Sequence, residues 1–341
     1  MAILNYYDTI MGIDSTSFLP LFNKLWSNEI ISQNLPYNNA LQINNGSRIR
    51  PLLTAWGYYA NCSFENNTHI ANYAISVELI HKSTILFDDL IDEDIARHGL
   101  KTFHIQYSEA EALLYATYLL NRGLYLMHEK DIVSNTFHTS ILLKTIDNIF
   151  RGGIKEISSK DSVFSISDVQ EIINLETTSL IQNSFVLGYM LSSENSSNVP
   201  DDVINIGNRC GHCFQILNDI EPFSAPNINK EYKGSINYDL GKNRKNIVIS
   251  SLYGACNPKE RKEIENTSDF SYVCTLAGKY KIIQILVKDI EIDIKNIVQS
   301  ATNLKTEHKE FCSDFIKFLV DMFKLCFEKC NLPLKNELFN N

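Results

Sequence analysis

A nearly continuous apolar segment that ends in acids is the feature that most constrains this chain. The segment from Ala74 to Phe87 is apolar on nearly every face, and Asp88 and Asp89 follow it directly. A helix that is apolar all round is buried, so the acids at its end point into a cavity or cleft rather than into bulk water. Asp92 follows Asp88 by four residues, and positions i and i+4 share a helix face. The sequence therefore predicts a buried helix that ends in a carboxylate pair.

A carboxylate pair of this kind indicates a site for magnesium and a diphosphate. A buried carboxylate cluster is unfavourable unless something pairs with it. Mg²⁺ prefers oxygen ligands and typically takes one or two carboxylates together with substrate phosphates. Arg97 follows closely in the sequence, where its guanidinium can hold a substrate phosphate. We therefore expect a diphosphate held through Mg²⁺ at the mouth of an apolar cavity, since a solvated helix end fits the apolar segment poorly.

Composition narrows the class of protein. The 341 residues are enough for a large core, and the formal net charge of −9 argues against a nucleic-acid binder. The N-terminal residues lack the pattern of a secretory signal, and no uncharged apolar run has the length of a membrane span. The eight cysteines show no disulfide framework. We expect a soluble, cytoplasmic protein without a nucleic-acid partner or a transmembrane segment.

Helical periodicity is frequent in the chain, whereas strand signals are weak. Apolar residues recur three and four positions apart over residues 141–149, 166–191 and 282–298. Residues 222–246 are rich in Pro, Asn, Gly and Lys, which is typical of a loop. These patterns predict one all-helical domain over residues 1–341 with a long polar loop near its centre.

Two further patterns are more readily structural than functional. The large apolar residues from Phe311 to Cys326 form one helical stripe, which we expect to pack on the body of the domain rather than on a membrane surface. Cys210 and Cys213 have the spacing of a thiol-redox motif. Their context is helical and no strand precedes them, so we do not expect a redox role.

Several stretches of the chain resemble the trans-isoprenyl diphosphate synthases, also called the polyprenyl synthetase family. G-S-R-I-R-P at residues 46–51 is similar to the family's G-K-R-x-R-P. D-D-L-I-D at residues 88–92, with Arg97 after it, is similar to the first aspartate-rich motif and the R-R-G that follows. Residues 211–219 are similar to G-x-x-F-Q-x-x-D-D, and residues 78–81 match E-L-I-H. The resemblance implies an all-α, single-domain antiparallel helical bundle around a deep apolar cavity.

The resemblance also implies a Mg²⁺-dependent prenyltransferase of isoprenoid biosynthesis. Such an enzyme ionises an allylic diphosphate and condenses it with isopentenyl diphosphate to a longer trans-prenyl diphosphate. Water must be excluded, because it would quench the allylic cation. Ser83 and Thr84, five and four positions before Asp88, are small and leave the cavity floor open, which implies a product of about twenty carbons or more. The family commonly forms homodimers, so a homodimer is implied as well.

Roles for individual residues follow from the same resemblance. Asp88 and Asp92 are implied as Mg²⁺ ligands, with Asp89 in support. Thr177 and Gln215 match polar groups near the reacting carbons. The implied substrate contacts are Arg97 at the allylic diphosphate, together with Ser47, Arg48, Arg50, His81, His98 and Lys242. The further implied metal ligands are Asn218, Asp219 and Glu176.

At two positions the sequence differs from the family pattern in a way that weakens the implied pocket for isopentenyl diphosphate. Ser47 stands where the family has a lysine, and His98 stands where it has a second arginine. Each charge-assisted phosphate contact is worth about 1.5–3 kcal/mol, so the loss of two is substantial. Arg48, Arg50 and a protonated His98 can restore part of the missing charge.

The second aspartate-rich motif is degenerate. It reads N-D-I-E-P at residues 218–222, where the asparagine can offer a carbonyl oxygen to Mg²⁺ but Pro222 offers no side-chain ligand. The family's Lys-Thr pair on an earlier helix is Glu176 and Thr177 here, and Gly153 replaces a family glutamine. We hypothesise that Glu176 helps to hold the metal that the second motif cannot hold alone.

Two other functions stay open. A class I terpene cyclase, or a prenyltransferase to another acceptor, would keep the ionisation and dispense with isopentenyl diphosphate. Pro222 and Pro226 occupy the positions of the serine and glutamate of a cyclase metal motif, which argues against a standard cyclase. A weakly active or regulatory subunit is the other alternative, although the intact acids of residues 88–92 and Arg97 argue against it.

Overall fold

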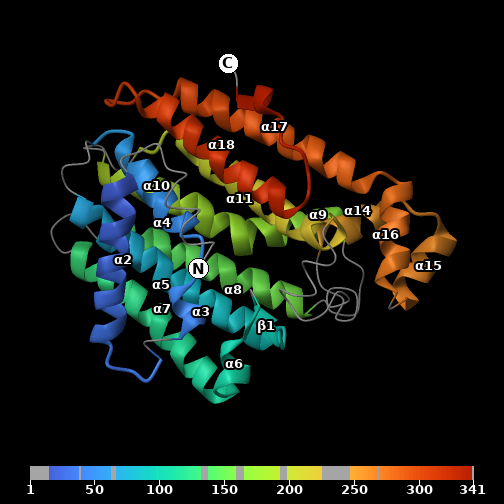
Figure 1. The fold of residues 1–341 in the computed structure, drawn as a ribbon, viewed down its shortest axis with the longest axis horizontal. Helices are drawn as coiled ribbons and strands as arrows, with labels where there is room; N and C mark the ends of the chain where they lie inside the picture. The colour runs from blue at the N-terminus through green and yellow to red at the C-terminus, as the bar shows by residue number, and fades with distance from the viewer. Residues whose placement is uncertain are drawn as a thin grey trace.

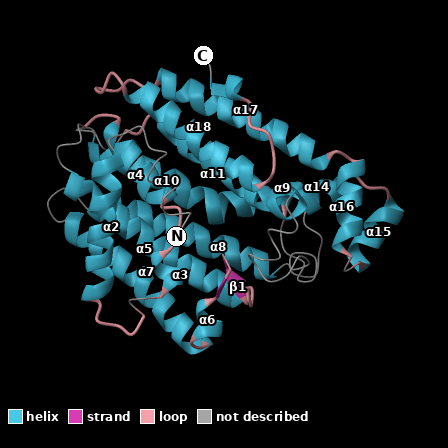
Figure 2. Cartoon of the chain, in the orientation of Figure 1, coloured by secondary structure: helices cyan, strands magenta, loops and turns pink. Residues whose placement is uncertain are grey.

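The computed structural model describes residues 15–37, 40–62, 67–97, 99–131, 137–158, 165–192, 198–224, 246–267 and 269–339. These residues are almost entirely helical, so the all-α prediction is confirmed (Figure 2). In chain order the helices are α2 (Ser15–Ser32), α3 (Leu41–Asn44), α4 (Ile49–Tyr59), α5 (Asn67–Ile91), α6 (Phe103–Gln106), α7 (Glu109–Asp131), α8 (Phe137–Ser158), α9 (Ile166–Ile173), η2 (Asn174–Thr178), α10 (Ser179–Ser192), α11 (Asp201–Ser224), α14 (Ile247–Ala255), α15 (Pro258–Asn266), α16 (Phe270–Lys279), α17 (Ile282–Asn303), α18 (Phe311–Lys329) and η3 (Asn336–Phe339).

One short hairpin interrupts the helices. Strands β1 (Ala96–Arg97) and β2 (Leu100–Lys101) pair antiparallel, with Arg97 opposite Leu100. The hairpin lies near α6 at one end of the molecule, whereas α17 and α18 run along one side and α15 and α16 lie at the opposite end from α2 (Figure 1). The hairpin matters for function because it places Arg97 just after the end of α5.

Helix α5 forms the centre of the fold and carries the acids at its C-terminal end. Its 25 residues correspond to about 37 Å of helix. Every residue from Tyr73 to Ile80 is buried, and the helix packs against α2, α4, α7 and α10. This burial is what a helix that is apolar all round predicts.

The crossing of α4 and α10 brings two backbones into direct contact. A Cβ atom on Gly188 of α10 would lie 1.9 Å from the carbonyl oxygen of Thr54. A Cβ atom on Gly57 of α4 would lie 2.1 Å from the carbonyl oxygen of Phe185. Only glycine fits at either position, so this crossing fixes α4 and, with it, the loop that precedes Ile49.

Helices α9 and α10 continue into each other through a π-helical turn. The helix predicted over residues 166–191 is therefore confirmed, with the π-helical turn η2 at Asn174–Thr178. The Ser165 hydroxyl starts it by accepting from the Asp168 amide over 3.2 Å. Single π-helical turns are frequent at functional sites, and this one carries Glu176 and Thr177.

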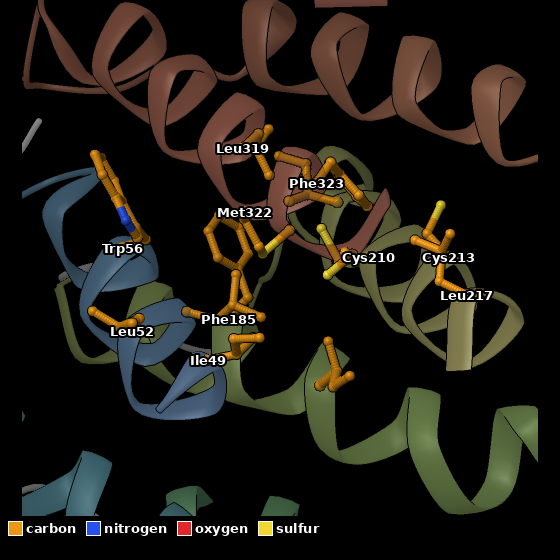
Figure 3. Packing of buried hydrophobic residues seen from close by; sticks show 14 of the residues in the cluster. Ile49, Leu52, Trp56, Phe185, Cys210, Cys213, Leu217, Leu319, Met322 and Phe323 are labelled. Carbon is orange, nitrogen blue, oxygen red and sulfur yellow. The ribbon is translucent and has the colours of Figure 1, made fainter. Parts of the chain in front are cut away.

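The C-terminal stripe packs on the body of the protein, as expected. The Phe315 ring lies 5.3 Å from those of Trp56 and Phe185, measured between centroids. Leu319 and Phe323 of α18 point toward the same interior, which Figure 3 shows. The helix predicted over residues 282–298 is confirmed within α17.

The cysteines of α11 belong to the core. Cys210 and Cys213 are fully buried, and burial raises the pKa of both thiols. A thiol of raised pKa has little thiolate at neutral pH, so neither suits redox chemistry.

The prediction of a loop over residues 222–246 is wrong for residues 222–224, which are helical. Helix α11 continues to Ser224 and includes Pro222 in its last turn, where proline cannot donate a hydrogen bond to the Asn218 carbonyl. Residues 225–245 lie outside the described part of the chain. No described helix combines the length and the apolar character that crossing a membrane requires.

Candidate active site

The acids at the end of α5 occupy unequal environments. The Asp88 side chain is 60% exposed, whereas the Asp89 side chain is 1% exposed. The Asp92 amide donates to the Asp88 carbonyl over 2.8 Å, so the chain keeps its helical path just beyond Ile91. Asp88 and Asp92 therefore lie on one face, and Asp89 points inward.

Arg97 joins these acids from β1. Its Nε donates to Asp89 Oδ1 over 2.5 Å and its Nη2 donates to Asp88 Oδ2 over 3.0 Å, with Asp94 Oδ2 at 3.7 Å. Burial raises the pKa of the Asp89 carboxyl to about 6, and Arg97 opposes that rise. Burial by itself would lower the pKa of Arg97, but Asp89 and Asp88 raise it above its ordinary value. Arg97 therefore stays charged and partly neutralises the acids.

A cavity with a basic lining lies next to Arg97. It encloses about 100 Å³ between the loop before α4 and the C-terminal half of α5. One carboxylate lines it, that of Glu78, against the cations of Arg48, Arg50, Lys82 and Arg97. Ser47 and His81 line it as well. A cavity with this excess of cations attracts an anion of high charge.

Arg48, which the resemblance implied as a substrate contact, lines the cavity and is also bonded inside the protein. Its Nη1 donates to Glu78 Oε1 over 2.5 Å, and its Nη2 donates to the Asn44 carbonyl over 2.5 Å. The guanidinium also lies 4.7 Å from the centre of the Trp26 ring, a cation–π contact. Its backbone is left-handed, with φ 54°, at the residue before α4. Arg48 therefore holds the loop in place, and Glu78 balances its charge.

Arg50 and His81 form a pair with unused donors. Arg50 Nη1 donates to His81 Nε2 over 2.9 Å. Burial lowers the pKa of His81 well below its ordinary value, and the nearby Arg50 charge lowers it further. The ring is thus neutral, and since Nε2 accepts, the proton is assigned to Nδ1. Burial lowers the pKa of Arg50 to about 10, so it stays charged at neutral pH. Arg50 Nε and His81 Nδ1 are buried without a hydrogen-bond partner, as expected of donors kept for a ligand.

Lys82 is the cation of this cavity that the sequence analysis missed. Its ammonium donates to the Asn45 carbonyl and lies 3.8 Å from Glu78 Oε1. Burial lowers the pKa of Lys82 to about 8, and Glu78 opposes that fall. The residue belongs to no motif quoted above. Its place four residues after Glu78, as an opposite-charge helix pair, is the signal that could have found it.

Glu176 lies over two glycines of α8. A Cβ atom on Gly152 would lie 2.5 Å from Glu176 Cγ, and one on Gly153 would lie 3.6 Å from Glu176 Oε1. The absence of a side chain at these positions leaves room for the Glu176 carboxylate. The two positions at which the sequence differs from the family pattern, Gly153 and Glu176, therefore lie next to each other in the structure.

Thr177, Gln215 and Asp219 form one hydrogen-bonded chain. The Thr177 hydroxyl donates to Gln215 Oε1 over 2.7 Å, and Gln215 Nε2 donates to Asp219 Oδ1 over 2.8 Å. The Ile247 amide donates to Asp219 Oδ2 over 2.8 Å. Both carboxylate oxygens of Asp219 are thus bonded within the protein, and Asp219 is buried, whereas Asn218 is exposed. Asp219 connects α11 to the start of α14, a role that the motif did not reveal.

No protein-only metal cluster is present among the residues that the structure describes. Nowhere in them do three or more His, Cys, Asp or Glu residues gather closely enough to hold an ion by themselves. The donor set fits Mg²⁺ in another way, because this ion usually combines one or two carboxylates with substrate phosphates. The Asp88 carboxylate is open to solvent and available to such a complex. His98 and Lys242 lie outside the described residues.

Comparison with known proteins gives a consistent result. A sequence model of the polyprenyl synthetase family matches residues 29–274. The geranylgeranyl diphosphate synthase of Saccharolobus solfataricus is 25% identical over 80% of this chain and 80% of its own length. Component 2 of the heptaprenyl diphosphate synthase of Geobacillus stearothermophilus is 30% identical over 53% of this chain and 55% of its own length.

Solved structures share the fold. The heptaprenyl diphosphate synthase of Staphylococcus aureus covers 93% of this chain and 98% of its own, with a TM-score of 0.78 at 19% identity. The polyprenyl synthase of Caulobacter crescentus, complexed with calcium and isoprenyl diphosphate, covers 93% of this chain and 96% of its own, with a TM-score of 0.77 at 19% identity. The match of the family model over most of the sequence, together with the acids of α5 and the basic cavity beside them, leads to one conclusion: the chain belongs to the polyprenyl synthetase family.

Proposed function

We propose that this protein is a Mg²⁺-dependent prenyltransferase that condenses an allylic diphosphate with isopentenyl diphosphate to a longer trans-prenyl diphosphate. The observation that carries the proposal is the basic cavity beside the acids of α5, because it offers two adjacent places for two diphosphates. Membership of the polyprenyl synthetase family gives the class of reaction.

The cavity is the proposed site for isopentenyl diphosphate. Arg50 Nε and His81 Nδ1 are buried donors without partners, and both residues line the cavity. Buried polar groups are normally hydrogen-bonded, so orphan donors on two residues of one basic lining favour an anionic ligand. Because this pocket is intact at Arg50 and His81, we favour isopentenyl diphosphate over an uncharged acceptor.

The face of Asp88 and Asp92 is the proposed site for Mg²⁺ and the allylic diphosphate. Bound Mg²⁺ would make that diphosphate a better leaving group. Arg97 is charged and lies between Asp88 and the cavity lining, where it can turn to the same diphosphate when it releases Asp88. Asp89 stays buried and orients Arg97 through the 2.5 Å bond to Nε.

Glu176 is proposed as the carboxylate that assists the weakened second motif. Asn218 is exposed but uncharged, and Asp219 is bonded to Gln215 and Ile247. Glu176 has the space over Gly153 that it needs to turn its carboxylate. Glu176→Lys should therefore lower Mg²⁺-dependent turnover, measured as diphosphate release against Mg²⁺ concentration, whereas higher turnover would contradict this role.

The uncharged residues of the site would orient the substrate and keep water away from the reacting carbons. We assign Thr177 and Gln215 to the polar positions beside the reacting carbons, where their mutual bond of 2.7 Å keeps them oriented. The apolar interior along α5 would keep water from the allylic cation. The deep apolar cavity that the prenyl chain needs is part of this proposal.

Product length is proposed to be about twenty carbons or more, since the residues beneath the acids are small. Thr84 lies one turn below Asp88 on the same face, and its hydroxyl donates to the His81 carbonyl over 2.8 Å. Ser83 is fully buried beside it. Neither side chain is large enough to stop a growing prenyl chain.

A homodimer is proposed from exposed apolar side chains on two neighbouring helices. Leu114 and Tyr125 of α7 are 71% and 54% exposed, and Ile154 and Leu143 of α8 are 66% and 52% exposed. Large apolar side chains open to solvent can be covered by a second copy of the chain. The relative from Geobacillus stearothermophilus is named as a component, so a heteromer is the alternative, and sedimentation of the purified chain separates the two.

A single domain and a cytoplasmic location are proposed from the hydrophobic core and from the cysteines. One hydrophobic cluster includes residues from Phe18 to Phe339, which supports a single domain over residues 1–341. All eight cysteines are free, which supports a reducing compartment such as the cytoplasm.

A product assay tests the proposed reaction. The purified protein is incubated with Mg²⁺ and allylic diphosphates of increasing length, with and without isopentenyl diphosphate, and the products are identified by mass spectrometry. We expect longer prenyl diphosphates that form only when isopentenyl diphosphate is present. Hydrocarbons or alcohols formed without it would instead indicate a cyclase, and no product in any mixture would indicate a regulatory subunit.

A further inference from the structure

Lys82 lies in the cavity against the uncharged residues of the loop before α4. The residue comes directly after His81 on α5 and is 3% exposed. A Cβ atom on Gly46 would lie 3.1 Å from Lys82 Nζ, so the ammonium lies directly against the loop that continues into Ser47. Ser47, Lys82 and Arg50 line the same cavity.

Two other cations of the cavity are already balanced by carboxylates. Arg48 pairs with Glu78 over 2.5 Å, and Arg97 pairs with Asp89 over 2.5 Å. Lys82 Nζ is 3.8 Å from Glu78 Oε1, a distance too long for a hydrogen bond. That oxygen already accepts a hydrogen bond from Arg48. Arg50 and Lys82 are thus the cations of this described lining that have no carboxylate at hydrogen-bond distance.

The Lys82 ammonium also has donors to spare. It makes one short hydrogen bond, to the Asn45 carbonyl, and a second contact of 3.5 Å to the Gln42 carbonyl, at the outer limit for a hydrogen bond. An ammonium carries three N–H donors. A buried ammonium with an unspent donor, which shares its only nearby carboxylate in this described lining with Arg48, is poorly compensated unless an anion binds beside it.

We propose that Lys82 supplies, from α5, the second fixed positive charge that binds the diphosphate of isopentenyl diphosphate, and so takes over from a loop that carries serine at position 47. The inference rests on the proposed function, because it names the residue that restores the acceptor pocket. Arg50 and Lys82 then flank the diphosphate from α4 and α5, and His81 Nδ1 donates between them.

Four variants separate a charge role from a structural one. Lys82→Met removes the charge and keeps an unbranched stem, and Lys82→Arg keeps the charge. Ser47→Lys combined with Lys82→Met returns a cation to the same cavity from the loop. Lys288→Met, on the exposed face of α17, is the matched control for loss of a lysine elsewhere. Circular dichroism and thermal melting verify that each variant is folded.

Steady-state kinetics give the first readout. Lys82→Met should raise the KM for isopentenyl diphosphate about 10- to 100-fold, as expected for one lost charge-assisted contact. The KM for the allylic diphosphate should change less than about threefold. Lys82→Arg and the double variant should recover most of the loss, whereas Lys288→Met should behave as the wild type. A double variant no better than Lys82→Met would overturn the proposal, because Lys82 would then act only by holding the Asn45 loop.

A binding measurement gives a readout that needs no turnover. Calorimetric titration with inorganic pyrophosphate in the absence of Mg²⁺ should give about 10-fold or greater weakening in Lys82→Met, with recovery in the double variant. Equal affinity in wild type and Lys82→Met would overturn the inference. A wild type that binds pyrophosphate through Lys82 yet makes no prenyl product would contradict the proposed function alone, so the two failures are distinguishable.

Discussion

Replacing Lys82 by methionine should change the stability of the unliganded protein in a way that depends on pH. The pKa of Lys82 falls from 10.5 to about 8, mainly because of burial. Each pKa unit corresponds to about 1.4 kcal/mol, so the charged Lys82 destabilises the folded protein by about 3 kcal/mol at neutral pH. Methionine removes that penalty but leaves the Asn45 carbonyl without its donor, which costs about 1–2 kcal/mol. The variant should therefore be more stable than the wild type at pH 7 by about 1–2 kcal/mol.

This advantage should shrink as the pH rises. Between pH 8 and 10.5 the unfolded Lys82 still binds a proton that the folded Lys82 has released, so the wild type gains stability relative to the variant. From pH 7 to pH 9.5 the difference in unfolding free energy should move toward the wild type by about 2 kcal/mol. Urea denaturation of both proteins at the two pH values measures it, and groups that both proteins share cancel in the difference. A difference that is constant with pH, or that moves toward the variant, would refute the reasoning.

Three further substitutions have defined outcomes. Gly188→Ala places a methyl group 1.9 Å from the Thr54 carbonyl oxygen and should reduce stability by about 3 kcal/mol or more, and an unchanged melting temperature would contradict the close α4–α10 crossing. Glu78→Gln leaves the buried Arg48 without its counter-ion and should reduce the free energy of unfolding by about 3–5 kcal/mol in urea, whereas a loss below about 1 kcal/mol would argue against a buried pair. Thr84→Phe should shorten the largest prenyl product seen by mass spectrometry, and unchanged products would place the chain tunnel elsewhere.

Local patterns in the sequence were enough to predict the helices and the acids of α5. Residues 74–80 of the apolar run are all buried because the helix lies between α4, α7 and α10, whereas some of residues 81–87 are only half-buried. The i, i+4 spacing placed Asp88 and Asp92 on one face, since that relation depends on the helix alone. The resemblance predicted the family, which the comparisons confirm.

Contacts between distant segments were not accessible to the same reasoning. The role of Asp219 as a metal ligand stays a prediction, and the sequence did not reveal that its carboxylate also accepts from the Ile247 amide, 28 positions away. The role of Arg48 as a substrate contact stays a prediction too, and its pairing with Glu78 of the neighbouring helix was not foreseen. Both outcomes depend on which helices pack together, and no spacing within a single segment reports that.

The missed role of Lys82 has a related cause. Motif comparison ended at His81, and the spacing from Glu78 predicts a helix pair but not the contact of Lys82 with the loop before α4. The crossing at Gly57 and Gly188 sets that placement, and these glycines belong to no motif. Charge compensation between Ser47 and Lys82 is therefore visible only in three dimensions.

Crystals grown with Mn²⁺, an unreactive allylic thiodiphosphate and isopentenyl diphosphate would show where the metal and both substrates bind, because anomalous scattering locates the metal and the sulfur. We expect a metal between the thiodiphosphate and the Asp88 and Asp92 carboxylates, with isopentenyl diphosphate bound in the cavity at Arg50 and His81. A metal bound away from these acids, or a basic cavity that stays free of isopentenyl diphosphate at saturating concentration, would contradict this expectation.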